Sequence, residues 1–194
     1  MFKPKLWLKA HVADRALRSL RDEIIQMINS DSRVLDVGCG TGDLLFKAAH
    51  KIQYGLGVDI DEDMITFANR KCKLGLISHL TFEKCDLETL ELSRFDVSTS
   101  TLCLHEMSAD KACRILSQMA ASSERVLIAD YTKPKTMLAK IGIEIDEMVS
   151  GHYQKFRQYR EAGAVAEYVC RSRLRINRVI PSSIDGIAIW DISV

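Results

Sequence analysis

Residues 34–42 read VLDVGCGTG, and this stretch constrains the fold more than any other part of the chain. An apolar run meets three glycines at alternate positions, Gly38, Gly40 and Gly42. Because glycine has no Cβ, the backbone turns sharply there and approaches a ligand closely. A strand, a glycine-rich turn and a helix together open the ligand-binding unit of many layered α/β proteins. The sequence therefore predicts an α/β sheet with a ligand site at this turn.

The spacing of the glycines differs from the dinucleotide-binding fingerprint. That fingerprint has two residues between its second and third glycines, whereas Thr41 alone separates Gly40 from Gly42. The third fingerprint position falls on Asp43, which would bring a negative charge near a pyrophosphate. The glycine spacing thus disfavours an NAD-linked oxidoreductase.

The pattern D-x-G-x-G-x-G, from Asp36 to Gly42, resembles motif I of the class I S-adenosylmethionine-dependent methyltransferases. The resemblance covers about residues 33–132. It implies an enzyme that binds S-adenosyl-L-methionine and transfers its methyl group. The alternative interpretation is a structural turn in an unrelated α/β fold.

Composition places the chain among ordinary globular domains. Its 194 residues suffice for one domain with a substantial core, and 27% of them are charged. The net charge of +1 gives no argument for nucleic acid or a membrane as a partner. The six cysteines are scattered and show no zinc-ligand spacing. We therefore expect no bound metal, and we expect the cysteines to be reduced thiols. No apolar run approaches ~18 residues. These features predict a soluble, cytoplasmic protein of unknown oligomeric state.

Alternating strand and helix patterns predict a mostly parallel, doubly wound, Rossmann-like sheet with helices on both faces. A helical region at 136–172 then precedes two strand-like runs that form a hairpin. The family resemblance implies seven strands, the last of them antiparallel. We expect strands at 33–37, 54–60, 80–86, 95–102, 125–131, 174–180 and 186–193. We expect a single domain over 1–194, made of an N-terminal helical segment (1–30), a cofactor-binding core (31–134), a helical lid (135–172) and a terminal hairpin (173–194).

Acidic residues follow the predicted strands at the edge where ligands bind in open α/β sheets. Asp59 ends the second strand, about twenty residues after the first glycine, where a carboxylate accepts hydrogen bonds from both hydroxyls of a ribose. The resemblance implies that Asp86 accepts from the adenine amino group, beside Leu87. A lone Asp after a strand is usually a cap or turn residue, but three at consistent spacing favour a site. The predicted cofactor-binding residues are Asp36, Gly38, Cys39, Gly40, Gly42, Asp59, Ile60, Asp86, Leu87, Thr101 and Leu102.

The segment TLCLHEMS after the fourth strand bears on the methyl acceptor. The chain has no proline between Pro4 and Pro134, which excludes the proline-rich motif of enzymes that methylate base amino groups. Cys103 follows a leucine rather than a proline, which excludes the cytosine C5 type. What remains resembles the small-molecule branch of the family. His105 and Glu106 are the predicted catalytic pair, for acid–base work or substrate orientation. The alternative makes His105 a partly buried loop residue with a satisfied hydrogen bond.

Residues after the fifth strand are expected to bind the substrate. Tyr131, which ends that strand, faces the pocket or packs in its wall, and His152 and Tyr153 begin the next candidate segment. The stretch ADYTKP (129–134) loosely resembles the ubiquinone/menaquinone-biosynthesis methyltransferases, although that group's usual turn before the strand is missing. We also expect the N-terminal segment, with Trp7 and His11, to help close the pocket.

A run of basic residues between 152 and 178 leaves two further functions open. It suits an anionic substrate or an RNA backbone, so an RNA-modifying methyltransferase is one alternative. Alternating arginines more often mark a solvated strand edge. A non-catalytic module that binds the cofactor and regulates a partner is the other alternative.

Overall fold

The chain folds around one seven-stranded sheet. In the computed structural model, which describes residues 14–86 and 94–193, the strand order is β3-β2-β1-β4-β5-β7-β6. Strand β7 is antiparallel to both of its neighbours and the other strands are parallel to one another. The predicted fold class is therefore confirmed. The strands are β1 (Arg33–Val37), β2 (Tyr54–Asp59), β3 (Leu80–Lys84), β4 (Phe95–Thr101), β5 (Ser123–Tyr131), β6 (Arg175–Pro181) and β7 (Ile187–Ser193).

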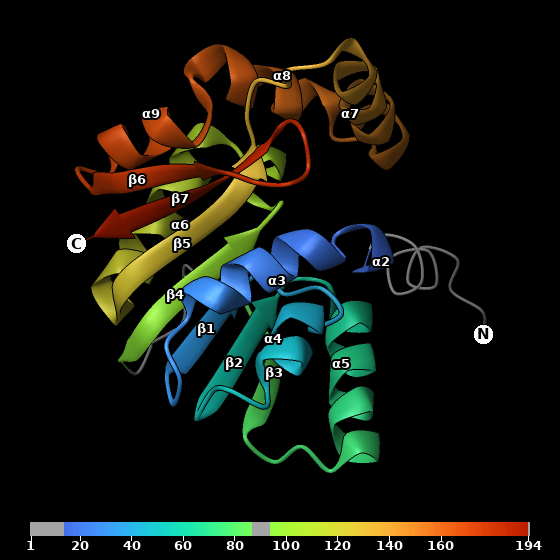
Figure 1. The fold of residues 1–194 in the computed structure, drawn as a ribbon, viewed down its shortest axis with the longest axis vertical. Coiled ribbons are helices and arrows are strands. Elements are labelled where there is room, and N and C mark those ends of the chain that lie inside the picture. Colours follow the sequence, from blue (N-terminus) through green and yellow to red (C-terminus); the bar gives the residue numbers. More distant parts are fainter. Residues whose placement is uncertain (1–13, 87–93, 194) are drawn as a thin grey trace.

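Helices cover both faces of this sheet (Figure 1). Helices α4 and α5 lie along β1 to β3, α3 packs against α4 and β5, and α6 and α9 lie along β4 to β6. Because each helix buries one apolar stripe against the sheet, the alternating pattern of the sequence is enough to set this layering. The helical elements are α2 (Asp14–Ala16), α3 (Arg18–Met27), α4 (Asp43–Ala48), α5 (Glu62–Gly75), η3 (Leu104–Glu106), α6 (Ala109–Ser122), α7 (Met137–Ser150), α8 (Tyr153–Ala162) and α9 (Ala164–Arg171).

The region 136–172, expected as one long helical stretch, is divided into α7, α8 and α9. The divisions fall at Gly151 and Gly163, whose φ angles are +81° and +107°. Side chains other than glycine rarely adopt this left-handed backbone, so each glycine ends one helix and lets the next start in a new direction. As a result, α7 and α8 stand above the carboxyl ends of the strands (Figure 1).

Three residues of the sequence predictions lie outside the described residues, namely Trp7, His11 and Leu87. Over 14–86 and 94–193, none of the helices has both the length and the apolar character needed to cross a bilayer. Cytoplasmic location stays a prediction.

Candidate active site

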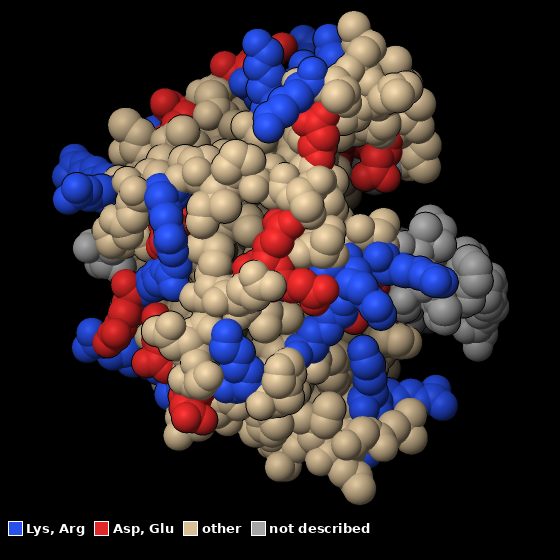
Figure 2. Space-filling view, in the orientation of Figure 1, with Lys and Arg blue, Asp and Glu red and all other residues tan. Residues whose placement is uncertain are grey.

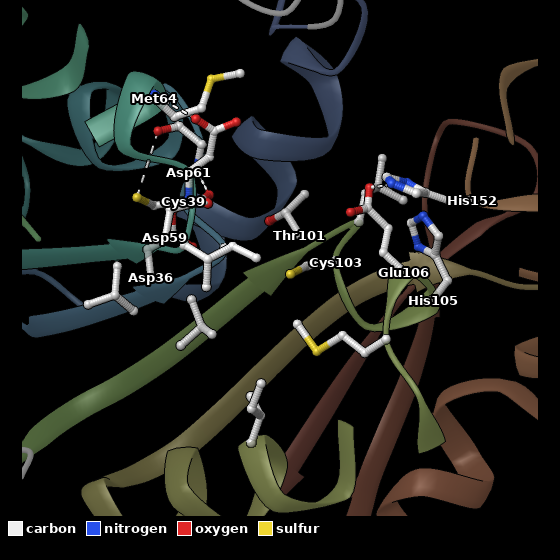
Figure 3. Close-up of a pocket in the computed structure, with 18 of the residues that line it drawn as sticks. Asp36, Cys39, Asp59, Asp61, Met64, Thr101, Cys103, His105, Glu106 and His152 are labelled. Atoms are coloured by element: carbon white, nitrogen blue, oxygen red, sulfur yellow. Dashed lines mark hydrogen bonds and ion pairs between the residues drawn. The ribbon is translucent and has the colours of Figure 1, made fainter. Parts of the chain in front are cut away.

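A cavity of about 590 Å³ opens at the carboxyl ends of β1, β2 and β4. Asp59 and Asp61 lie at one end of it, Thr101 and Cys103 lie in the middle, and Glu106 and His152 lie at the other end (Figure 3). Its size is in the range that holds a small molecule or cofactor. The cavity thus brings together the glycine turn and the segment after β4, as the sequence predicts.

The glycine turn forms the floor of the first end. Gly38, Gly40 and Gly42 all have left-handed φ angles, at +71°, +53° and +75°. A Cβ on Gly38 would overlap the Sγ of Cys103, and a Cβ on Gly42 would overlap the buried ring of Phe82. Glycine is therefore required at these positions for both backbone conformation and space.

Asp59 is held rigidly beside this turn. One carboxylate oxygen accepts the N–H of Gly40 at 2.8 Å, and the other accepts the N–H of Asp61 at 2.9 Å. Each carboxylate oxygen has a second lone pair, so both remain able to accept from a ligand hydroxyl. This arrangement fits the predicted ribose contact.

Asp36 lies beneath the turn and is almost fully buried. Burial raises the pKa of its carboxyl group to about 7, although the hydroxyl of Thr99, which donates to Oδ1 at 2.7 Å, and the charge of Arg21 act in the opposite direction. The burial of Asp36 thus disfavours its charged form beneath the turn, and the negative charge of Asp59 acts in the same direction.

A network from the N-terminal helices, which the sequence analysis missed, closes over the turn. Asp14 accepts the hydroxyl of Thr41 at 2.6 Å and the guanidinium of Arg21 at 2.7 Å. Arg21 also lies 3.3 Å from Asp43, at the start of α4. Asp14, Arg21 and Thr41 all line the cavity. This network was not predicted, because the helical pattern of residues 12–29 does not show which part of the chain the polar side of the N-terminal helices faces.

The other predicted cofactor residues are distributed around this end of the cavity. Asp86 lines it, and its Oδ2 accepts from the Nζ of Lys111 at 2.8 Å. The buried Oγ1 of Thr101 has no hydrogen-bond partner among the described residues, so a polar group of a ligand has a reason to bind there. Gly42 lies behind the wall rather than in it. The predicted residues that line the cavity are Asp36, Gly38, Cys39, Gly40, Asp59, Ile60, Asp86, Thr101 and Leu102.

The opposite end of the cavity is organised around His105, which is only 2% exposed. Its Nδ1 lies 2.6 Å from Oδ1 of Asp130, and its Nε2 lies 3.3 Å from Oε1 of Glu147. Asp130 is fully buried and also accepts the main-chain N–H groups of Leu104 and Tyr131. The three ionisable side chains therefore form a line from β5, through η3, to helix α7.

This surrounding decides the protonation state of His105. Burial alone lowers the pKa of the imidazole, but the two carboxylates, Asp130 above all, raise it to about 10. Burial and the carboxylates of Glu147 and Asp146 also raise the pKa of Tyr131, whose hydroxyl donates to Asp146 at 3.3 Å. At neutral pH, His105 is thus an imidazolium between two carboxylates, and Tyr131 is a neutral phenol in the wall.

The remaining predicted residues at this end separate into two groups. Glu106 and His152 both line the cavity, with Oε1 of Glu106 3.2 Å from Nδ1 of His152 (Figure 3). Tyr153 lies outside the cavity wall, where hydrogen bonding to Glu144 raises its pKa. Their functional roles stay predictions. Asp146 and Glu147 were not predicted, because the helical pattern of residues 136–172 does not reveal which face of the helix meets the cavity.

The basic run at 152–178 does not form one continuous docking face. Several of its arginines lie on different elements and bind neighbouring carboxylates, which leaves less positive charge available to an RNA backbone. The ion pairs are Arg157 with Glu161, Arg160 with Glu144, Arg171 with Asp110 and Arg178 with Asp191.

The chain is similar in sequence to known methyltransferases. The family described as "Methyltransferase domain" matches residues 28–164. Phosphoethanolamine N-methyltransferase 1 of Arabidopsis thaliana is 33% identical over 126 residues, which are 61% of this chain and 25% of the relative. A ubiquinone/menaquinone biosynthesis C-methyltransferase of Vibrio campbellii is 29% identical over 109 residues, which are 53% of this chain and 42% of the relative. The chain thus spans less than half the length of these relatives.

Solved structures with low sequence identity share the fold. A SAM-dependent methyltransferase from Aquifex aeolicus superposes with a TM-score of 0.68 and 14% identity, covering 100% of both chains. Magnesium protoporphyrin IX methyltransferase from Synechocystis PCC 6803, with bound SAH, gives a TM-score of 0.65 and 20% identity over 93% of this chain and 83% of that one. The chain belongs to the methyltransferase domain family, and its fold is that of the class I S-adenosylmethionine-dependent methyltransferases.

Proposed function

We propose that the protein transfers a methyl group from S-adenosylmethionine to a small-molecule acceptor. The observation that carries the proposal is the shared cavity, which joins the glycine turn and Asp59 to the segment of His105 and Glu106. The residues present fit the cofactor, because Gly38 and Gly40 line the cavity without side chains, Asp59 is held ready to accept hydroxyl groups, and Thr101 offers a buried hydroxyl.

When bound, the cofactor would supply an electrophilic methyl group on a positively charged sulfur, with the neutral thioether as its leaving group. The protein's part is then mainly positioning, which contributes about 7–11 kcal/mol in well-oriented reactions. Gly38 and Gly40 would bring main chain close to the adenosyl end of the cofactor, and Asp59 would hold its ribose. Tyr131 and Leu102 form part of the cavity wall that excludes water from the reacting atoms.

The two predicted catalytic residues take different roles in this proposal. An imidazolium has no lone pair to accept a proton, so His105 positions its neighbours instead of acting as a base. Glu106 has a partly exposed carboxylate at the acceptor end, next to His152. We assign Glu106 the proton-accepting role where the acceptor must lose a proton.

Calorimetry with S-adenosylhomocysteine tests the cofactor assignment. Asp59→Asn removes charge-assisted hydrogen bonds of about 1.5–3 kcal/mol, so we expect roughly a 10- to 150-fold weaker affinity. Asp63→Asn is the matched control, because Asp63 starts helix α5 and does not line the cavity, and its affinity should equal that of the wild type. Equal affinity of Asp59→Asn and wild type would contradict the assignment.

The acceptor class requires a second measurement. We expect radiolabelled methyl groups from the donor to appear in one compound of a small-metabolite panel, and we expect no incorporation into polynucleotide. Incorporation into RNA alone would reject the small-molecule acceptor while leaving the methyl donor intact.

A further inference from the structure

Helix α7 packs one side against the protein and presents a largely apolar side to solvent. Its inner side carries Glu147, which binds His105, and Ile143, which packs on the hydrophobic core. The opposite side is unusually exposed for large apolar residues. Exposed fractions there are 69% for Met137, 83% for Leu138, 49% for Ile141, 56% for Ile145, 64% for Met148 and 81% for Val149. We call these six residues the outer face of α7.

The outer face is one continuous stripe. At about 100° per residue, its six positions fall within an arc of roughly 120°, and Ile143 and Glu147 fall outside that arc on the other side of the helix. The stripe runs the length of the helix, because it contains both the first residue of α7 and the penultimate one. In Figure 2, the outer edge at the upper right, where Figure 1 places α7, shows uncharged side chains, and charged side chains lie beside it.

The area of the outer face is larger than a monomer normally exposes. Exposed fractions of this size on six large side chains correspond to roughly 700 Å² of apolar surface, above the ~300–600 Å² of the largest patch on a typical monomer. The value is also close to the ~800 Å² that each partner contributes to a standard protein interface.

The helix that carries this face is fixed to the body of the protein at both ends. Asp185 accepts the N–H groups of Lys135 and Thr136, directly before the helix begins. Near the other end, Glu144 pairs with Arg160 of α8, and Glu147 pairs with His105. The outer face is thus presented by an anchored helix, which lowers the ordering cost of binding.

We propose that the outer face of α7 is a homodimer interface in which two copies of this helix pack antiparallel. The stripe is symmetric about position 143. In an antiparallel pair centred there, Ile141 lies level with the partner's Ile145, Leu138 with the partner's Met148, and Met137 with the partner's Val149. Every apolar layer therefore meets an apolar layer, as a two-fold interface between identical surfaces requires.

The interface would also bear on the cavity. Asp146 and Glu147 belong to α7 and line the acceptor end of the cavity. Pairing of two α7 helices would hold this wall in place in both copies at once. The proposal nevertheless does not depend on the methyltransferase activity, because the interface is defined by the outer side of the helix alone.

Light scattering after size-exclusion chromatography tests the interface. We expect the wild-type mass to be twice the 21.9 kDa of the chain at tens of micromolar. Leu138→Glu and Ile145→Glu should each reduce the mass to that of one chain, with unchanged circular dichroism. Leu74→Glu is the matched control, because Leu74 is a 76% exposed leucine on helix α5, far from the outer face in the chain, and that variant should stay dimeric.

Cross-linking tests the antiparallel register. In a Cys170→Ser background, Ile141→Cys and Ile145→Cys protein should couple through a short bis-maleimide more strongly when mixed than either does alone. A monomeric wild type overturns the proposal, and so does a Leu138→Glu dimer that is unchanged in mass. Binding of monomeric wild type to lipid vesicles, abolished by Leu138→Glu, would assign the outer face to a membrane and likewise overturn the dimer.

Discussion

The end of the cavity beside the glycine turn combines left-handed main chain with several separate polar contacts, whereas the end beside His105 is centred on one line of buried charges. At the first end, the N–H groups of Gly40 and Asp61 fix one carboxylate, that of Asp59. At the second end, Asp130 and Glu147 enclose His105 at exposures of 2% or less. The first end depends on backbone shape and the second on a balance of buried charge.

This difference separates what each end tolerates. Main-chain hydrogen bonds survive most side-chain changes except those that alter backbone conformation, so the fold of the first end should be sensitive mainly at its glycines, and its ligand affinity at the glycines and Asp59. Removing one member of a buried cluster of charges leaves the others charged and unpaired. The resulting loss of stability is larger than the net stabilisation that the intact cluster provides. The second end should therefore be the more fragile of the two.

The largest expected effect is that of His105→Gln. It leaves Asp130 and Glu147 buried without the imidazolium, and we expect unfolding in urea at pH 6 to show a loss of about 3–5 kcal/mol. His50→Gln is the control, because His50 is exposed, and it should change the free energy of unfolding by less than about 0.5 kcal/mol. A loss below 1 kcal/mol for His105→Gln would mean that the buried charges do not hold this end together.

The pH dependence of the same pair of proteins sharpens the test. The pKa of His105 is raised to about 10 in the folded protein, above the usual value of 6.5. The stabilisation from its proton is therefore complete below about pH 6.5 and is lost as the pH rises towards 10. We expect the difference in unfolding free energy between wild type and His105→Gln to shrink across this interval. A constant difference would indicate that His105 is neutral when folded.

A smaller effect is expected at the first end, from Gly38→Ala. The left-handed backbone costs an L-residue about 1–2 kcal/mol, and the new Cβ would also displace the Cys103 side chain. Affinity for S-adenosylhomocysteine should fall at least tenfold. Gly142→Ala in α7 is the matched control, because nothing lies within 4 Å of its Cβ position, and it should leave affinity unchanged. Equal affinities for the two variants would contradict a close approach of ligand to Gly38.

The sequence alone predicts the first end well because its signals are local. The stretch 34–42 encodes the end of a strand and the turn into a helix within nine residues, and the strand that ends at Asp59 follows from its apolar pattern and length. The parallel direction of the first five strands also follows from the alternation of strand and helix, and the total of seven strands from the family resemblance. The antiparallel direction of β7 is also predictable from the sequence, because the connection at 181–185 is short enough for a hairpin and too short for a parallel crossover.

The second end was only partly predictable because its partners are far apart in the chain. His105 and Glu147 are 42 positions apart, and no periodicity connects them. The glycines that divide the helical region 136–172 are visible in the sequence, but the direction that each new helix takes depends on left-handed backbone and tertiary packing. The same limit explains why the link between Asp14 and Thr41 was missed.

The smallest expected effect, that of Tyr131→Phe, asks whether the two ends act independently. The main chain at Tyr131 is held by the hydroxyl of Tyr159, which donates to its carbonyl at 2.7 Å, so the substitution removes only the hydrogen bond to Asp146. We expect a loss of about 1 kcal/mol in unfolding free energy. Tyr153→Phe removes the hydrogen bond of a partly buried tyrosine to Glu144, and we expect a smaller loss there. Because the ring of Tyr131 packs beside His105, with 4.7 Å between the ring centroids, affinity for S-adenosylhomocysteine should change less than twofold. A tenfold fall in affinity would show that the end beside His105 also sets the geometry of the end beside the glycine turn. The two ends would then not be independent.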